Sequence, residues 1–464
     1  MKKLLYILSA VTALMLMALS CSKVDPDDGG KENDNAPSGI TLSEEQISVD
    51  RTAQQRSLTV TAPSRPKAVS DSDWLTIVDG TYSSYSITYT LNIAAFGEYG
   101  TREAVVTITS GSLTKTVKVI QTGREKPQTP DTDLAKDPVT DGITLRARAL
   151  YDYLMGQYGE MVISSIMANV NWNTEEAQKV FSATGKWPAM NCFDFIHMPY
   201  SGANWINYSD ISPVRNWWNA GGIVSLMWHF NVPQANGSAE YTCTPSATSF
   251  KASNALVEGT WENIWFYDQM GKVADVILQL QEAGIPAIWR PFHEAAGNYY
   301  ARNVSWNQAW FWWGTEGPEV FRQLWNTMQD YFYAKGIRNL LWVWTAQSYN
   351  GNPTVYDSDG EYYPGDGRVD IVARDLYGCS AEENYTEYVT LQAAYPHKMI
   401  VLGECGLNGA TPFASIPDAW LAGAHWGWFM PWYGSNMPGG EWWSTALSSE
   451  YVISRDELPF DLFE

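Results

Sequence analysis

The sequence has few basic residues for its length. Among its 464 residues, 30 are Lys or Arg and 51 are Asp or Glu, so the formal net charge at pH 7 is -21. Nucleic acids and anionic membranes are bound through cationic protein surfaces, which this composition does not favour. We therefore expect no nucleic-acid partner and favour a neutral polymer instead.

Cysteine is also scarce, and no two cysteines form a C-x-x-C pair. This spacing argues against a zinc site and against a fold that is built on disulfides. One or two disulfides among the last four cysteines stay open as an alternative. The five cysteines are Cys21, Cys192, Cys243, Cys379 and Cys405.

Long apolar runs are missing after the first twenty residues. Residues 1–20 contain Lys2-Lys3, an apolar stretch from Leu4 to Leu19 and then Ser20, which is the layout of an export signal. No later stretch is long and apolar enough to span a bilayer. Cys21 then resembles the lipid-modified cysteine of a Bacteroidetes-type lipoprotein, with simple secretion as the alternative. We expect residues 21–38 to be a flexible tether and the protein to be anchored in the outer membrane, at the cell surface, only through Cys21.

Aromatic residues, by contrast, are abundant: 23 Trp and 26 Tyr. The flat C–H faces of sugars stack on aromatic rings, while polar groups at the rim bind the hydroxyls. Such rings can also simply fill a large core. Because several of them stand beside carboxylates in the sequence, we favour carbohydrate binding.

Residues 39–123 alternate apolar and polar positions in short runs separated by turns, which predicts a small β-sandwich. Asp73-Trp-Leu75, the run from Arg102 and the closing Val119-Ile-Gln-Thr-Gly123 resemble a BACON domain. Such a domain is either a spacer, which we favour, or a glycan binder. Residues 124–141 are hydrophilic and rich in proline, as in a semi-extended linker.

Residues 142–464 alternate apolar strand-like runs with helical stretches, which predicts an α/β fold. One expected helix contains Met270, Val273 and Ile277 and ends at Gly284, and another extends from Pro318 to Gly336. Eight such units predict a (β/α)8 TIM barrel, whose catalytic side chains lie at the carboxyl ends of the strands. The expected strands are 162–168, 191–197, 222–229, 287–292, 340–345, 369–377, 399–404 and 424–432.

Two of the expected strands end in glutamate, Glu294 on the fourth and Glu404 on the seventh. A retaining glycosidase needs two carboxyl groups about 5–5.5 Å apart, one to attack the anomeric carbon and one to protonate the leaving oxygen. This chemistry needs no metal and no cofactor. A surface carboxylate or a salt bridge to Arg290 is the alternative for either residue.

The surrounding residues resemble glycoside hydrolase family 26 over nearly the whole barrel. The resemblance rests on Arg290-Pro-Phe-His-Glu294, Trp310-Phe-Trp-Trp-Gly314, Tyr363-Pro-Gly-Asp366, Asp375-Leu-Tyr377 and Gly403-Glu404. It implies a retaining endo-β-1,4-mannanase, with Glu294 as acid/base and Glu404 as nucleophile. The family also contains β-1,3-xylanases and mixed-linkage β-glucanases, so these activities stay open.

The resemblance further implies substrate-binding roles for residues around the two glutamates. His229 matches a histidine that binds sugar in the −1 subsite, Tyr377 a tyrosine that contacts the nucleophile, and Trp432 the floor of the −1 subsite. Tyr433 replaces an arginine of some mannanases, and the loop 295–309 is longer than usual. The full set of expected binding residues is Trp228, His229, His293, Trp310, Trp313, Asp375, Tyr377 and Trp432.

Another class of function also fits part of this pattern: a surface protein that binds glycans without cleaving them, on the same anchor and BACON-like domain. The presence of both glutamates argues against it. We expect a monomer that acts on a β-mannan-type polysaccharide.

Overall fold

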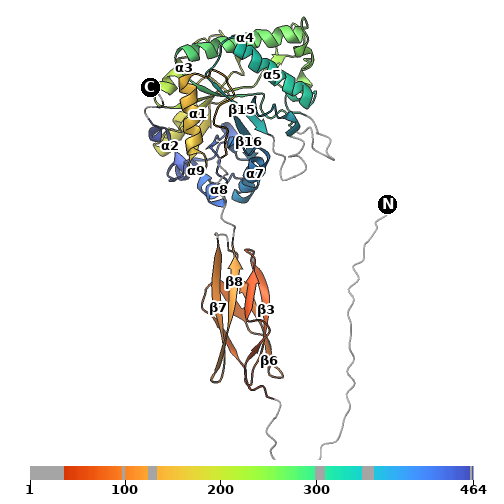
Figure 1. Ribbon diagram of the computed structural model, residues 1–464, viewed down its shortest axis with the longest axis vertical. Helices are drawn as coiled ribbons and strands as arrows, with labels where there is room; N and C mark the ends of the chain where they lie inside the picture. Colours follow the sequence, from red (N-terminus) through yellow and green to blue (C-terminus); the bar gives the residue numbers. More distant parts are fainter. Residues whose placement is uncertain are drawn as a thin grey trace, which may run out of the picture. The chain divides into compact units, whose positions relative to one another are not determined.

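The computed structural model describes residues 36–96, 100–123, 133–297, 309–346, 360–459 and 462. The predicted signal peptide, Cys21, most of the predicted tether and residues 298–308 of the long loop lie outside the described residues. The chain divides into two compact units, Met1–Lys126 and Pro127–Glu464 (Figure 1). The division falls within the predicted linker 124–141.

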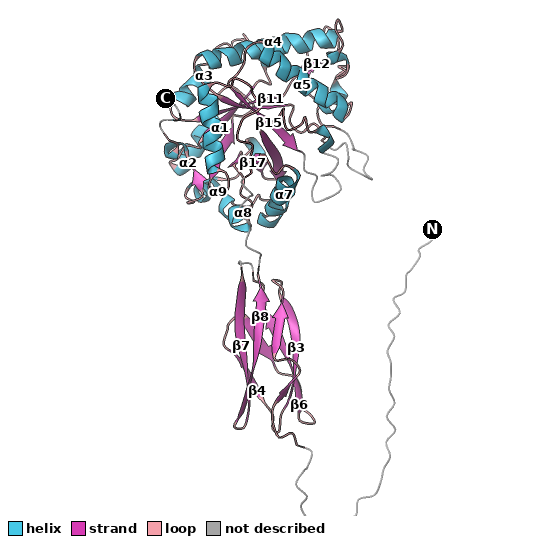
Figure 2. Cartoon of the chain, in the orientation of Figure 1, coloured by secondary structure: helices cyan, strands magenta, loops and turns pink. Residues whose placement is uncertain are grey.

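The first unit is a sandwich of two four-stranded sheets, as predicted (Figure 2). Along β6, alternate side chains from Ile87 to Ile93 are buried, and they form one core with residues of the other sheet such as Val106 and Val119. One sheet has the order β1 (Thr41–Leu42), β3 (Gln54–Thr61), β6 (Ser86–Ile93), β5 (Leu75–Val78). The other has the order β2 (Gln46–Val49), β8 (Leu113–Thr122), β7 (Thr101–Ser110), β4 (Lys67–Ser70).

The second unit contains the eight predicted parallel strands. In chain order they are β9 (Val162–Met167), β10 (Met190–Asp194), β11 (Ile223–Trp228), β14 (Ala287–Pro291), β15 (Leu340–Ala346), β16 (Ile371–Tyr377), β17 (Met399–Gly406) and β18 (Trp428–Phe429). From β9 to β17 each strand pairs with the next, and β18 pairs with β9. The sheet closes where Cys405 bridges Pro431 and the backbone N–H of Trp432 donates to the oxygen of Cys405 at 2.8 Å. The predicted (β/α)8 barrel is confirmed.

Helices surround this barrel (Figure 2). The two predicted helices are α4, which the Thr260 hydroxyl caps at its start, and α5, which begins with Pro318 at its first turn. Both end just before a glycine with positive φ, Gly284 and Gly336, where a side chain would be strained. Among the described residues, the α-helices are α1 (Leu145–Gln157), α2 (Glu175–Thr184), α3 (Ser212–Asn219), α4 (Trp261–Glu282), α5 (Pro318–Ala334), α7 (Ala381–Ala394), α8 (Ile416–Ala422) and α9 (Gly440–Leu447).

The end of the predicted linker belongs to the barrel unit instead. The backbone N–H of Val139 donates to Asp370 at 2.7 Å, that of Ala135 donates to the His397 oxygen at 3.0 Å, and Leu134 is buried. These backbone groups find their hydrogen-bond partners on the barrel, so residues 134–139 cannot act as a free spacer. The linker prediction was therefore wrong for this part.

Side chains along the barrel strands alternate between the lumen and the helices. On β14, Arg290 points into the lumen, whereas the ring of Trp289 lies 6.0 Å from that of Phe332 on α5. Trp342 on β15 likewise packs on Trp325 of α5 at 5.7 Å. This period of two decides which strand residues can reach the barrel mouth.

Cys192, Cys243, Cys379 and Cys405 are free thiols, so no disulfide joins these four. In the part of the chain that the structure describes, no helix combines the length and apolar character needed to cross a bilayer.

Candidate active site

Three carboxyl groups meet at the carboxyl ends of the barrel strands. Glu294 follows β14, Asp375 lies on β16 and Glu404 on β17, and one oxygen of each lies within 4.8 Å of the others. All three side chains belong to buried residues, which are 8%, 4% and 4% exposed. The two predicted catalytic glutamates are thus brought together, with Asp375 as a third acid beside them.

The chain that carries Glu294 has an unusual backbone. Phe292 and Glu294 both have a φ of 50°, in the left-handed region that residues other than glycine seldom adopt. The backbone of Gly314 packs directly against this turn, since a Cβ atom at position 314 would lie 1.7 Å from the oxygen of Ala295. Such backbone strain is found where the surrounding structure must aim a side chain.

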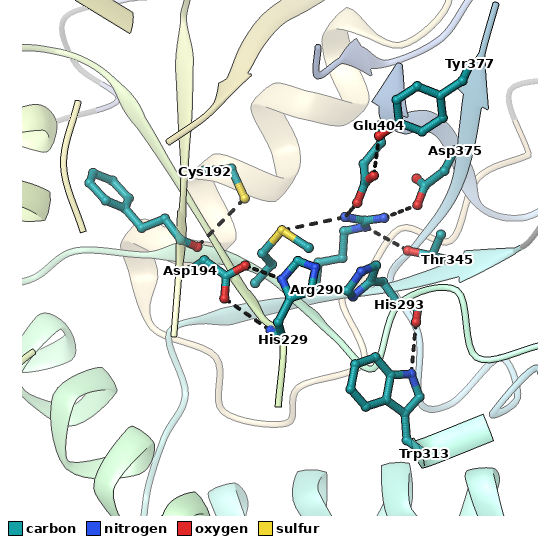
Figure 3. A network of polar contacts seen from close by, with 12 residues as sticks. Cys192, Asp194, His229, Arg290, His293, Trp313, Thr345, Asp375, Tyr377 and Glu404 are labelled. Carbon is teal, nitrogen blue, oxygen red and sulfur yellow. Dashed lines mark hydrogen bonds and ion pairs between the residues drawn. The ribbon is translucent and has the colours of Figure 1, made fainter. Parts of the chain in front are cut away.

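Arg290 is the central cation of the cluster. Its Nη1 donates to Oε1 of Glu404 at 2.8 Å, its Nη2 donates to Asp375, and its Nε donates to the Thr345 hydroxyl at 2.8 Å (Figure 3). The salt-bridge alternative raised for Glu404 is therefore also real. A buried guanidinium with both carboxylates supplies the positive charge that such an acidic site needs.

A bulge in the sheet aligns the two acids that Arg290 binds. The register between β16 and β17 shifts at Arg374/Asp375, so that Asp375 pairs with Glu404 and not with Gly403. A Cβ atom on Gly403 would lie 2.6 Å from Asp375 Oδ1 and 3.0 Å from Arg290 Nε. Position 403 therefore has to be glycine for the ion pairs to form as they do.

We expect Gly403→Ala to lower the free energy of unfolding by about 1–3 kcal/mol, the usual cost of overpacking a buried site. The added methyl group would push Asp375 away from Arg290. Urea unfolding of the variant measures this loss, with Gly367→Ala as control because a Cβ atom there meets nothing within 4 Å. Equal unfolding midpoints for the two variants would contradict the crowding at position 403.

Tyr377 completes the contacts of Glu404. Its hydroxyl donates to Oε2 of Glu404 at 2.6 Å, while Arg290 donates to Oε1. Both oxygens of Glu404 thus accept a hydrogen bond, which fixes the orientation of the carboxyl group. Burial, and after it the negative charge of Glu404, raise the pKa of Tyr377 well above its usual value, so its hydroxyl keeps its proton.

Glu294 lies in a different electrostatic setting. Burial, and then the charges of Glu404 and Asp375, raise its pKa well above the usual value, while Arg290 opposes the shift. Burial also raises the pKa of Asp375 in spite of its bond to Arg290. The site thus holds two carboxyl groups with a raised pKa, Glu294 and Asp375, beside Glu404, whose two oxygens both accept hydrogen bonds.

The two predicted histidines make an edge-to-face contact at the same mouth. His229 is held by Asp194, which binds its Nδ1 at 2.5 Å and its backbone N–H at 3.1 Å. The ring of His293 lies 4.4 Å from that of His229 at a steep angle. Burial lowers the pKa of His293 well below its usual value, so this ring is neutral, and its Nδ1 finds no hydrogen-bond partner among the described residues.

Among the predicted aromatic residues, Trp432 and Trp310 lie where a ligand can reach them. Trp432 is partly buried with its ring 5.9 Å from that of His229, and Trp310 is 37% exposed. Phe311, which was not predicted, also stands here, with its ring 4.8 Å from that of His293.

Two of the predicted binding residues, Trp228 and Trp313, are part of the core. Trp228 is 1% exposed and stacks on Phe230, on the helix side of β11, because the neighbouring His229 takes the lumen side. Trp313 is completely buried, and its indole N–H donates to the backbone oxygen of His293 at 2.9 Å (Figure 3). Neither ring can stack on a sugar in this structure. Trp313 supports the turn that carries Glu294.

Below the ion pairs, sulfur atoms line the lumen. Met167, Cys192, Met227 and Met430 form one buried cluster, and Arg290 Nη1 lies 3.8 Å from the sulfur of Met227. Burial raises the pKa of Cys192 to about 12, so this thiol stays protonated. The layer of side chains beneath the carboxylates is therefore uncharged and rich in sulfur.

Two residues with clear roles here were not assigned any from the sequence. Arg290 was considered only as a possible partner of a glutamate, although the period of two along β14 places it, and not Trp289, in the lumen. Asp194 is the last residue of β10, and this position at the carboxyl end of a barrel strand could have identified it.

Comparison with known proteins agrees with this architecture. The family model described as glycosyl hydrolase family 26 matches residues 139–457, more than half of the chain, and the BACON model matches residues 60–122. A mannan endo-1,4-beta-mannosidase of Thermothelomyces thermophilus is 31% identical over 67% of this chain and 61% of its own length. A mannan endo-1,4-beta-mannosidase B of Piromyces sp is 30% identical over 68% of this chain and 52% of its own length. The chain thus spans only about half to three fifths of these curated relatives.

Among solved structures, the match extends over nearly the whole length of the other protein. The GH26 domain of an endo-beta-mannanase/endo-beta-glucanase from Prevotella bryantii is 52% identical, with a TM-score of 0.68, over 70% of this chain and 99% of that one. A beta-mannanase from a symbiotic protist of the termite Reticulitermes speratus, complexed with gluco-manno-oligosaccharide, is 31% identical, with a TM-score of 0.58, over 70% and 98%. This chain belongs to glycosyl hydrolase family 26.

Proposed function

We propose that this protein is a retaining endo-β-1,4-mannanase that cleaves internal bonds of mannan, glucomannan or galactomannan. The observation that carries the proposal is the pair Glu294 and Glu404, whose nearest oxygens lie within 4.8 Å. Retaining glycosidases place their carboxyl groups about 5–5.5 Å apart, whereas inverting ones need about 6.5–9.5 Å to admit a water molecule. The geometry supports direct attack by a carboxylate.

In the first step, the Glu404 carboxylate attacks the anomeric carbon of the sugar, and the bond to the leaving oxygen breaks as Glu294 gives that oxygen its proton. In the second step, Glu294, now ionised, takes a proton from a water molecule, which attacks the same carbon and releases Glu404. The raised pKa of Glu294 suits the first role, and the hydrogen bonds from Arg290 and Tyr377 suit the anionic nucleophile.

Asp375, His229 and Trp432 stand around this pair as positioning and binding groups. Asp375 acts through Arg290, which it holds against Glu404. His229, oriented by Asp194, offers its outer nitrogen to a sugar hydroxyl, and Trp432 offers a ring face beside it. His293 precedes the acid in the chain and contacts the ring of Phe311.

The mannan substrate is supported by the relatives, several of which are named mannan endo-1,4-beta-mannosidases, and by the protist enzyme in complex with gluco-manno-oligosaccharide. A panel of galactomannan, glucomannan, mixed-linkage β-glucan and β-1,3-xylan tests it, with released reducing ends as the readout. We expect release from the first two polymers. Release only from the β-glucan or the xylan would replace the proposed substrate, and retarded migration in a mannan gel without any release would indicate a glycan-binding protein.

A further inference from the structure

A row of aromatic rings lies on the barrel outside the carboxylate cluster. Each ring contacts the next, with ring centres 5.0–5.8 Å apart. In order along the row, the members are His197, Trp205, Tyr200, Tyr241 and Trp265, and we call them the ring row.

The row has an anchored end and an open end. Trp265 stacks on Tyr241 at an angle of 20°, and its indole N–H donates to the backbone oxygen of Asn231 at 3.3 Å. Toward the other end, which is His197, Trp205 is 59% exposed and Tyr200 is 38% exposed. Two large rings are thus held in place from one side and left open to solvent, although burying them would have stabilised the fold.

The ring row shares the end of the barrel that carries the acids. Its first three members belong to the segment between β10 and α3, and Tyr241 lies on the short strand β13 (Tyr241–Thr242), between β11 and α4. Both segments leave the carboxyl ends of β10 and β11. Asp194, the last residue of β10, accepts a bond from the Ile196 N–H at 2.7 Å and one from the Tyr208 hydroxyl at 2.8 Å. The same Asp194 orients His229, so the loop of the ring row and the candidate active site share one anchor.

The neighbours of the open rings suit an uncharged, hydroxyl-rich ligand. Ser201, Asn204 and Asn207 are exposed beside Trp205 in the same loop, and among the described residues the one charged neighbour that acts on Tyr200 is the exposed carboxylate of Glu240. Amide and hydroxyl groups beside an aromatic face are the combination that binds sugar hydroxyls and the C–H face together. A surface for a protein partner would instead need a far larger apolar area than two rings among polar side chains provide.

We propose that the ring row is an accessory binding site for a polysaccharide chain, outside the catalytic centre, that retains the polymer while Glu294 and Glu404 cleave it. The site deepens the proposed function and rests on it for the choice of a β-mannan as the ligand. Its effect is confined to long substrates, since a short one occupies only the catalytic centre.

The test compares the wild-type protein with the double variant Tyr200→Ala/Trp205→Ala. We expect the double variant to lose retardation in a galactomannan or glucomannan gel and to show a KM for the polymer raised roughly five- to tenfold, with kcat unchanged. Hydrolysis of a dinitrophenyl β-mannobioside should be unchanged. Trp205→Tyr, which keeps a ring, should restore most of the binding in a chain with Tyr200 intact.

Leu145→Ala is the matched control. Leu145 is 90% exposed, and it begins α1 at the other end of the barrel, where the Thr144 N–H donates to the Arg338 oxygen just ahead of β15. Removing this apolar side chain should leave retardation and KM as in the wild type. Thermal unfolding of every variant shows whether the fold is kept.

The outcomes separate this proposal from the proposed function. If a folded double variant still hydrolyses mannan and its retardation and KM are unchanged, the binding role of the ring row is refuted and the proposed function is not affected. A wild type that is retarded but cleaves nothing, and a variant that is not retarded, would support the ring row and refute the mannanase. A wild-type dimer that the double substitution converts to a monomer would show a protein interface and overturn the ring row as a polysaccharide site.

Discussion

Glu404→Ala is expected to abolish the turnover of mannan, with kcat lowered by roughly 10⁴-fold or more. The substitution removes the atom that attacks the anomeric carbon, so no covalent intermediate can form with any leaving group. Stopped-flow measurement with a dinitrophenyl β-mannobioside should therefore show no burst of dinitrophenolate. A burst of normal size would show that another group, such as Asp375, is the nucleophile.

Loss of folding must be separated from loss of chemistry in this variant, because Arg290 bonds to Glu404 in the buried cluster. Breaking one partner of a buried ion pair costs about 3–5 kcal/mol of stability. Glu404→Gln keeps the size of the side chain and an oxygen that can accept from Arg290 or Tyr377, but it has no anionic nucleophile. We expect it to be folded and equally inactive.

Glu294→Ala is expected to lower kcat on mannan by about 10²–10⁴-fold, the usual contribution of a positioned proton donor. The defect should depend on the leaving group. Dinitrophenolate departs without a proton, so the first step should proceed and produce a burst, whereas the second step lacks its base and should be slow. A single slow phase without a burst would contradict the role of Glu294 as acid/base.

Glu294 also determines in which direction the activity on mannan changes with pH. The raised pKa of Glu294 keeps its acid form populated further toward neutral pH, and activity on mannan should fall as the pH rises through that pKa. The burst rate of the wild type with the dinitrophenyl substrate should lack this fall, because departure needs no proton there.

The sequence was sufficient to predict the barrel and its eight strands, and it predicted that Glu294 and Glu404 lie at the same end of the barrel. The continuous apolar runs of the strands reflect burial on both faces, and a glutamate at the end of such a run stands out. All residues of β17 from Met399 to Gly406 are buried, including Glu404, so the pattern and the structure agree there.

The sequence was less informative on which tryptophans bind sugar. Trp228 and His229 are neighbours on one strand, and only one of them can face the lumen. Which one it is depends on the register and on the packing outside the barrel, where the Trp228 ring stacks on Phe230, which in turn contacts Phe266 of α4. The burial of Trp313 depends on a long-range contact, its bond to the His293 oxygen, which no local pattern reveals.

The bulge between β16 and β17 was also beyond sequence reasoning. It arises from a register shift between strands and places Asp375 opposite Glu404, with Gly403 leaving room for Arg290. Asp375 was predicted to bind substrate, but its bond to Arg290 favours a positioning role.

The central claim is that Glu404 attacks and Glu294 exchanges the proton, and the configuration of the azide products tests it most directly. Azide is added to Glu294→Ala and to Glu404→Ala with the dinitrophenyl β-mannobioside, and NMR determines the anomer of each product. In Glu294→Ala, azide should intercept the glycosyl-enzyme and give the β-mannosyl azide. In Glu404→Ala, any azide product should be the α anomer, because azide attacks the substrate directly from the side left empty by the carboxylate. An α product from Glu294→Ala with a β product from Glu404→Ala would contradict the assignment.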